Sequence, residues 1–458
     1  MKILLCNVSK KYETASHDYA GLFYLAGALE AAGFEPLVFH GKSEDLLGEI
    51  ARHLPAAVGF SCDFDNVRII EDVSQKIKER WGLPVVVGGP QSIALGRAFL
   101  ENSGVDDILR GEGEISLPIL LDAVLKGEGE LGEVKGLAIL KDGVFHETPP
   151  EIVGDLDALP LPAYHTSLHK DRAYGNVIFT GRGCPYRCAY CAPSPGKRNV
   201  RLRSIPLVLD EIETNLKNNP GMRCLVVMDD TFTLGRERIE AFCEGMRELR
   251  KERDLAWYCE CHVGRIKSFM DVLPSMIDAG LIRLQIGIES GDQNVIDRYN
   301  KHVRIDDILE FVSYAAECGL AQIATNFIVG GPKEREGATA DLIRELIDRA
   351  PGVIDIITGF LRAYPGTEIS ENPEKFGLRL HDESGRRTGD DYPFVTPVGE
   401  TQDQVMRQRQ ELNKTIRRCM QQKIKNRELK RATVMKQFEA ALKYRMKSRW
   451  FGEIAANP

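Results

Sequence analysis

Three cysteines, Cys184, Cys188 and Cys191, share one short segment with the spacing Cys-x3-Cys-x2-Cys. Three thiolates can bind three irons of a [4Fe–4S] cluster and leave the fourth iron open. An open iron can bind a substrate, whereas a cluster with four cysteine ligands usually only carries electrons. A structural zinc site is the alternative, but such sites usually need a fourth Cys or His at matching spacing, and none is nearby. The triad therefore predicts a reactive cluster.

The segment that carries the triad alternates strands and helices. Strands are predicted at 176–180, 224–228, 256–261, 284–288, 324–329 and 354–361, with helices between them. Six strands with crossover helices predict a partial (β/α)6 barrel over residues 174–370. The chemistry of such barrels lies at the carboxyl ends of the strands, and the three cysteines follow the first strand.

Residues 1–150 have a similar rhythm and predict an N-terminal doubly wound parallel sheet. Ligands of such sheets bind beyond the carboxyl ends of the strands. Those ends carry polar or glycine-rich residues here, at 7–9, 61–63 and 88–91. A proline-bracketed linker is expected at 151–173.

The C-terminal region, 371–458, is expected to be helical and basic. Residues 401–458 hold 15 Lys and Arg against 5 Asp and Glu, whereas the whole chain has a net charge of −7. Apolar residues recur there at helical spacing, which favours a cap over the open barrel. The alternative is a docking surface for an acidic partner, such as a leader peptide. No recognised nucleic-acid-binding motif is present, so nucleic acid is not an expected partner.

Bulk properties indicate a globular enzyme-sized chain of 458 residues. The apolar run at the N-terminus is too short for a signal peptide, and no apolar run suggests a membrane span. The eleven cysteines show no disulfide framework, so we expect a cytoplasmic protein with reduced thiols.

The ordered motifs along residues 1–370 resemble those of the radical S-adenosylmethionine (SAM) enzymes, in the subgroup with an N-terminal cobalamin-binding-type domain. The resemblance implies that SAM binds the open iron and that one electron from the cluster cleaves it. The resulting 5′-deoxyadenosyl radical abstracts hydrogen from an unactivated carbon. The resemblance also implies an electron donor such as flavodoxin or ferredoxin.

The same resemblance implies SAM-binding residues. Tyr190 matches the aromatic residue that lies along the adenine. Asp229 and Asp230 stand where many members have Gly-Gly-Glu, and we favour Asp230 as acceptor for the SAM ammonium, with the other aspartate as an N-cap of the next helix. Further matches concern the ribose, the adenine, the sixth strand end and the SAM carboxylate; they are Glu289 with Ser290, Asn326 with Gly330, Tyr364, and Arg198 (or Arg201 or Arg203).

The first domain is similar to the cobalamin-binding domain of the subgroup. Its candidate cobalamin contacts are Ser61, Gly88 and Gly89. The Asp-x-His-x-x-Gly motif, whose histidine ligates cobalt in many cobalamin proteins, is absent, and His17 lies in the closest stretch. Cobalamin therefore remains an expectation from the resemblance, without a histidine ligand.

The leading hypothesis is cobalamin-dependent methylation of a carbon atom in a natural product or peptide. The alternative is a cobalamin-independent maturase that epimerises, cross-links or excises part of a ribosomally made peptide. Cys419 is a candidate hydrogen donor to a substrate radical, although free cysteine is more often a small buried apolar residue. A non-catalytic scaffold is disfavoured by the intact motifs.

Overall fold

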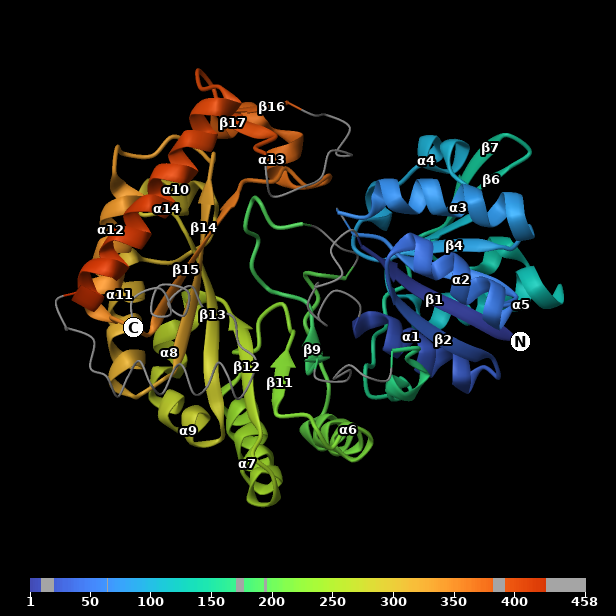
Figure 1. The fold of residues 1–458 in the computed structure, drawn as a ribbon, viewed down its shortest axis with the longest axis horizontal. Coiled ribbons are helices and arrows are strands. Elements are labelled where there is room, and N and C mark those ends of the chain that lie inside the picture. The colour runs from blue at the N-terminus through green and yellow to red at the C-terminus, as the bar shows by residue number, and fades with distance from the viewer. Residues whose placement is uncertain (10–19, 64, 170–176, 193–195, 382–391, 426–458) are drawn as a thin grey trace. The chain divides into compact units, whose positions relative to one another are not determined.

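The computed structural model describes residues 1–9, 20–63, 65–169, 177–192, 196–381 and 392–425. The chain forms two compact units (Figure 1). The first unit holds 1–183 and 193–221, and the second holds 184–192 and 222–458. The domain boundaries expected from the sequence remain predictions.

The first unit is built on a seven-stranded sheet with the order β2-β1-β3-β4-β5-β6-β7. The first five strands are parallel: β1 (Lys2–Val8), β2 (Glu35–Gly41), β3 (Ala57–Ser61), β4 (Val85–Gly88) and β5 (Asp107–Leu109). β6 (Leu137–Lys141) and β7 (Val144–Glu147) add an antiparallel hairpin. Its two-residue loop is Asp142-Gly143, both with positive φ, as a type I′ turn requires.

Helices cover both faces of this sheet, because alternate strand residues face opposite cores. Leu4 and Cys6 of β1 pack in one core with α2 (Ser43–His53), α3 (Val67–Trp81) and α4 (Arg97–Asn102). Ile3 and Leu5 pack in the other with α1 (Ala20–Ala31) and α5 (Gly113–Lys126). Parallel sheets are normally covered in this way. The unit also contains β8 (Val177–Ile178), the pair β9 (Gly181–Arg182) and β10 (Arg201–Leu202), and α6 (Ile205–Asn218).

The second unit contains parallel strands in the order β15-β14-β13-β12-β11. They are β11 (Cys224–Val227), β12 (Ala256–Cys261), β13 (Leu281–Glu289), β14 (Gln322–Val329) and β15 (Ile354–Phe360). The connections carry α7 (Arg236–Glu252), α8 (Ile266–Phe269), α9 (Leu273–Asp278), α10 (Gln293–Arg298), α11 (Ile305–Glu317) and α12 (Ala338–Arg349). The predicted fold class is confirmed.

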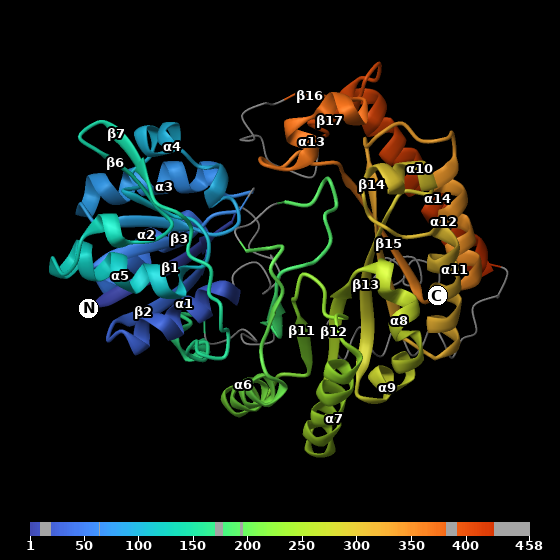
Figure 2. The ribbon, with the colours of Figure 1, turned by 180° about the vertical axis from the view of Figure 1, so that it is seen from behind.

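The C-terminal region begins with α13 (Glu368–Glu371) and the antiparallel pair β16 (Leu378–Leu380) and β17 (Val395–Pro397). The long helix α14 (Gln402–Lys425) then packs against β14, β15 and α12 (Figure 2). Val405, Ile416 and Met420 are buried along it. The helical cap is confirmed for residues 402–425, and the rest of the basic tail lies outside the described residues.

None of the helices in the described residues is both long enough and apolar enough to cross a membrane.

Candidate functional site

The three motif cysteines lie on one loop of the second unit. Cys184 and Cys188 are buried, and Cys191 is partly buried. Burial raises the pKa of the Cys184 thiol, and the charges of Cys191 and Cys188 raise it further. The three sulfurs are thus close enough to repel one another as thiolates, and they need a positively charged partner. The irons of a [4Fe–4S] cluster supply that charge, so the donor set fits the cluster.

A site for a single metal ion is a separate matter. Within the described part of the chain, no group of three or more His, Cys, Asp and Glu side chains is arranged to hold one metal ion. A cluster places each thiolate on a different iron, so its ligands need not converge on one point.

Backbone hydrogen bonds anchor the cysteine loop at the carboxyl end of the barrel strands. The amide of Ala189 donates to the carbonyl of Tyr299 over 2.9 Å, and the amide of Ile369 donates to the carbonyl of Ala189 over 3.2 Å. The side-chain amide of Asn300 donates to the carbonyl of Arg187 over 3.0 Å. The segment after α10 therefore positions the loop.

Tyr190 and Glu289, both predicted to bind SAM, lie in contact with each other. The Tyr190 hydroxyl donates to Oε1 of Glu289 over 2.8 Å. Nζ of Lys301 donates to the same oxygen over 2.7 Å and to the Tyr190 hydroxyl over 2.9 Å. Lys301 is 4% exposed and Glu289 is 6% exposed. The carboxylate predicted to meet the ribose is thus already held by Tyr190 of the cluster loop and by Lys301.

Gly287 makes room for this arrangement. Glu289 ends β13 with a φ of +73°, in the left-handed region, so its side chain turns back toward the strand. A Cβ on Gly287 would clash with Oε1 of Glu289 and lie 2.9 Å from Nζ of Lys301. The Gly-Ile-Glu order of the motif therefore has a steric reason.

Asp229 and Asp230 follow β11 in different environments. Asp229 is buried, whereas Asp230 is exposed. The charge of Asp230 contributes to the raised pKa of Cys184, so its carboxylate lies close to the cluster loop, where a SAM ammonium would need an acceptor. The N-cap of α7 is Gly235, so the expectation that one aspartate caps this helix is wrong.

The remaining SAM candidates lie along the neighbouring strand ends. Asn326 pairs in register with Gly287 across β13 and β14. The Ser290 hydroxyl donates to Glu334 over 2.8 Å, and Tyr364 follows β15 and is partly buried. Their roles toward SAM remain predictions.

Gly330 packs against the C-terminal helix α14. Its φ is +82°, and a Cβ there would meet Val405 of α14 at 2.8 Å. The glycine therefore admits Val405 of the C-terminal helix, and its predicted contact with the adenine remains a prediction.

Sequence reasoning missed two residues beside the cysteines, Lys301 and His262. His262 follows the strand β12 and Lys301 follows the helix α10. In such connecting segments the sequence has no periodic pattern that would mark a polar side chain facing the protein interior. Burial, followed by the charges of Lys301 and His302, lowers the pKa of His262 to about 3. The imidazole beside the cluster loop is therefore neutral.

Cys419 does not lie at the strand ends where the cluster loop is anchored. Burial raises the pKa of its thiol, and the other charges that act on it include Arg344 and Asp348 of α12. Asp348 is in the last turn of α12, which leads to the amino end of β15. The expected hydrogen donor is therefore at the wrong end of the barrel.

The arginines after the cluster loop belong to the first unit. Arg201 donates to Glu112 over 2.7 Å, and Arg203 donates to Glu211 over 2.5 Å, with both arginines buried. Those two are engaged by internal carboxylates, whereas Arg198 is exposed, and its role toward the SAM carboxylate remains a prediction.

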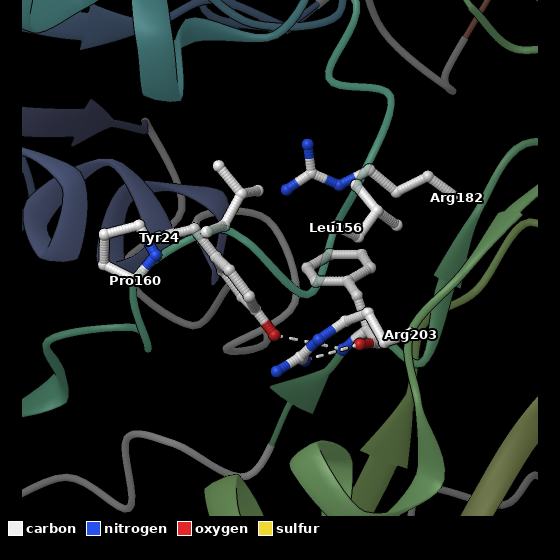
Figure 3. Close-up of a pocket in the computed structure, with 7 residues that line it drawn as sticks. Tyr24, Leu156, Pro160, Arg182 and Arg203 are labelled. Atoms are coloured by element: carbon white, nitrogen blue, oxygen red, sulfur yellow. Dashed lines mark hydrogen bonds between the residues drawn. The ribbon is translucent and has the colours of Figure 1, made fainter.

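A small pocket in the first unit lies against Arg203. Tyr24, Leu156, Pro160 and Arg182 also line it (Figure 3). Its cavity volume is about 10 Å³, which is room for about one water molecule. The pocket is therefore no site for an organic cofactor.

The predicted cobalamin contacts gather at the carboxyl edge of the first sheet. Ser61 pairs in register with Gly88, and the amide of Cys62 donates to the carbonyl of Gly88 over 2.8 Å. Gly89 has a φ of +96°, and a Cβ there would lie 2.8 Å from the carbonyl oxygen of Cys62. Glycine at this position is therefore required by the close packing of the turn on Cys62, and contacts of Ser61, Gly88 and Gly89 with cobalamin remain predictions. His17 lies outside the described residues.

Two family models match the chain. Residues 178–346 match the radical SAM superfamily, and residues 11–121 match the B12 binding domain.

Relatives extend these matches over most of the chain. It is 29% identical over 397 residues to the "uncharacterized methyltransferase PH0819" of Pyrococcus horikoshii, covering 81% of this chain and 83% of the relative. It is 26% identical to the anaerobic magnesium-protoporphyrin IX monomethyl ester cyclase of Cereibacter sphaeroides, covering 85% of this chain but only 66% of the relative.

A solved structure shares the fold. The radical SAM methyltransferase TsrM from Kitasatospora setae, with cobalamin and a [4Fe–4S] cluster bound, is 20% identical with a TM-score of 0.66. The alignment covers 88% of this chain and 84% of TsrM.

The two family models confirm the radical SAM family and the B12-binding domain expected from the motifs, and with them the expected [4Fe–4S] cluster, SAM and cobalamin. The chain is therefore a radical SAM enzyme with an N-terminal B12-binding domain.

Proposed function

We propose that the chain is a cobalamin-dependent radical SAM methyltransferase that methylates a carbon atom of a natural product or peptide. One observation carries the proposal: a loop with three cysteines stands at the carboxyl ends of a parallel barrel in a chain that also carries a B12-binding domain. The methyltransferase named in P. horikoshii, similar over most of both chains, supports it.

When bound, the cluster supplies the electron that cleaves SAM, and cobalamin supplies a carrier for the methyl group. The chain's own residues bind and orient. We assign Cys184, Cys188 and Cys191 to the irons and Asp230 to the SAM ammonium. Tyr190 and Glu289 border the nucleoside, with Lys301 fixing the carboxylate. Ser61, Gly88 and Gly89 form the edge that receives cobalamin.

The two alternatives differ in their support. A peptide maturase without cobalamin has less support, because residues 11–121 match the B12 model. The second alternative is a reaction without methyl transfer. Its support is the likeness to the cyclase of C. sphaeroides, which is named for ring formation.

Cofactor content and SAM products together test the proposal. The full chain is purified anaerobically from cells supplied with cobalamin, and cobalt, iron and sulfide are quantified. Methyl transfer requires stoichiometric cobalt and release of S-adenosylhomocysteine beside 5′-deoxyadenosine. Iron and sulfide without cobalt, or 5′-deoxyadenosine as the only SAM product, contradict it.

Variants of the triad test the ligand assignment separately. Replacing Cys184, Cys188 and Cys191 together with Ala should abolish reductive SAM cleavage. Cys318→Ala is the matched control, since Cys318 is a partly buried cysteine after α11. Cleavage that persists in the triple variant overturns the assignment.

We also propose a flavodoxin or ferredoxin as electron donor, and an acidic leader peptide or partner protein for the basic C-terminal region. A cytoplasmic location remains part of this proposal.

A further inference from the structure

His262 lies against one of the three cysteines. It directly follows β12, and its Nε2 is 3.8 Å from Sγ of Cys188. This distance is within the range of hydrogen bonds to sulfur, which is a larger atom than oxygen. Whether Nε2 donates a hydrogen bond to Sγ or accepts one from it depends on which ring nitrogen carries the hydrogen.

The other ring nitrogen settles the tautomer. The backbone amide of Gly264 donates to Nδ1 of His262 over 3.0 Å. A backbone N–H can only donate, so Nδ1 accepts and carries no hydrogen. An imidazole whose Nδ1 accepts a hydrogen bond carries its ring hydrogen on Nε2, the nitrogen that faces Cys188.

The ring is also held in place. Tyr186 stacks on it with ring centroids 3.4 Å apart and an interplanar angle of 10°. The amide of His262 donates to the Thr231 hydroxyl over 3.1 Å. A Cβ on Gly264 would lie 3.0 Å from the ring, so the glycine permits the close approach of its amide. The ring face, the backbone amide and Nδ1 of His262 are thus each held by a separate contact. Together these contacts orient Nε2 toward Cys188.

We propose that His262 is a positioning residue for the cluster: its Nε2–H donates to the Cys188 thiolate and raises the reduction potential of the cluster. Hydrogen bonds to cluster sulfurs are among the features that set the potential. The bond withdraws electron density from the thiolate and stabilises the reduced state, which carries more negative charge. The inference rests on Cys188 being a cluster ligand and not on methyl transfer.

The experiment compares His262→Leu, which keeps bulk and removes the donor, with His262→Gln, which restores an N–H donor. His302→Asn is the control, because His302 is an exposed neighbouring histidine with a positive φ that Asn tolerates. Each full-length protein is reconstituted anaerobically and titrated by EPR without SAM, substrate or cobalamin. We expect a lower midpoint potential for Leu, a potential near the wild type for Gln, and no change in the control. Equal potentials for wild type and Leu overturn the inference.

A second measurement avoids variants that lose the cluster. Wild-type protein labelled with ¹⁵N-histidine should show coupling of the reduced cluster to a histidine nitrogen by electron spin-echo modulation. The coupling should disappear in His262→Gln, and its absence from the wild type overturns the inference. Because neither measurement involves methyl transfer, a negative result here is distinct from a failure of the proposed function.

Discussion

Nζ of Lys301 lies 2.7 Å from Oε1 of Glu289, and the two side chains are 5% and 7% exposed. The pair is buried directly behind the cluster loop, since the charge of Lys301 also acts on Cys188 and Cys191. A buried pair gains little net stability over apolar residues, but removing one partner leaves an uncompensated charge. Its value here is therefore to fix where the Glu289 carboxylate lies.

Lys301→Met should destabilise the protein by about 3–5 kcal/mol, because Glu289 would stay buried without its cation. The change is measured as the free energy of unfolding in urea. Lys333→Met, at an exposed lysine, is the control and should have little effect. The double variant Lys301→Met with Glu289→Gln should recover part of the loss; a double variant no better than the single one argues against the buried pair.

Gly287→Ala should displace the Glu289 carboxylate, because the new methyl group would occupy its place. Under the proposed role of Glu289, SAM affinity should fall by about tenfold, the cost of one lost hydrogen bond to a charged group. Calorimetric titration with SAM measures this. Gly359→Ala on β15 is the matched control, since nothing lies within 4 Å of a Cβ there. Equal affinities of the two variants would remove Glu289 from the SAM site.

Periodicity and motif order predicted much of this molecule. The strand at 256–261 has the predicted bounds, because a largely apolar run between turn residues leaves little choice. Tyr190 and Glu289 could be located from their motifs. The β6–β7 hairpin was not predicted, although its Asp142-Gly143 turn is a recognisable signal.

Tertiary contacts decided the rest. Lys301 follows α10 in an irregular segment, and only the fold brings it to Glu289. Arg201 and Arg203 look like a basic face in the sequence, yet Arg201 is engaged by the partly buried Glu112 and Arg203 by the buried Glu211. Gly330 fits a family motif, but its space is filled by Val405, which is 75 positions further along the chain.

Asp107 on β5 should make stability depend on pH. Burial, followed by the charge of the neighbouring Asp106, raises the pKa of its carboxyl group to about 7. The unfolded value is about 3.9, so the folded state binds more protons between these values. The Asp107 contribution is therefore favourable at low pH and is lost as pH rises from about 4 to 7.

Asp107→Asn should remove this loss. Relative to the wild type, the variant should be more stable at pH 8, by up to about 4 kcal/mol, and nearly equal at pH 4. Thermal unfolding followed by circular dichroism across this range measures the difference. Asp72→Asn, at an exposed carboxylate, should show no such trend; a flat difference for Asp107→Asn would mean that this carboxyl is ionised in the folded state at low pH.

The C-terminal region offers a test that separates capping from docking. Val405 is fully buried against Val329 and Phe360, so Val405→Ala should cost about 2 kcal/mol of stability without changing affinity for an acidic peptide. Removal of residues 426–458 takes away 8 Lys and Arg and 3 Asp and Glu and leaves α14 intact. This truncation should preserve the unfolding midpoint and weaken peptide binding, with the loss greatest at low salt, because the lost attraction is between exposed charges. Fluorescence anisotropy with a labelled acidic peptide measures it. Unchanged binding would leave this region with the cap alone, whereas a truncation that lowers the unfolding midpoint would show that the cap extends beyond α14.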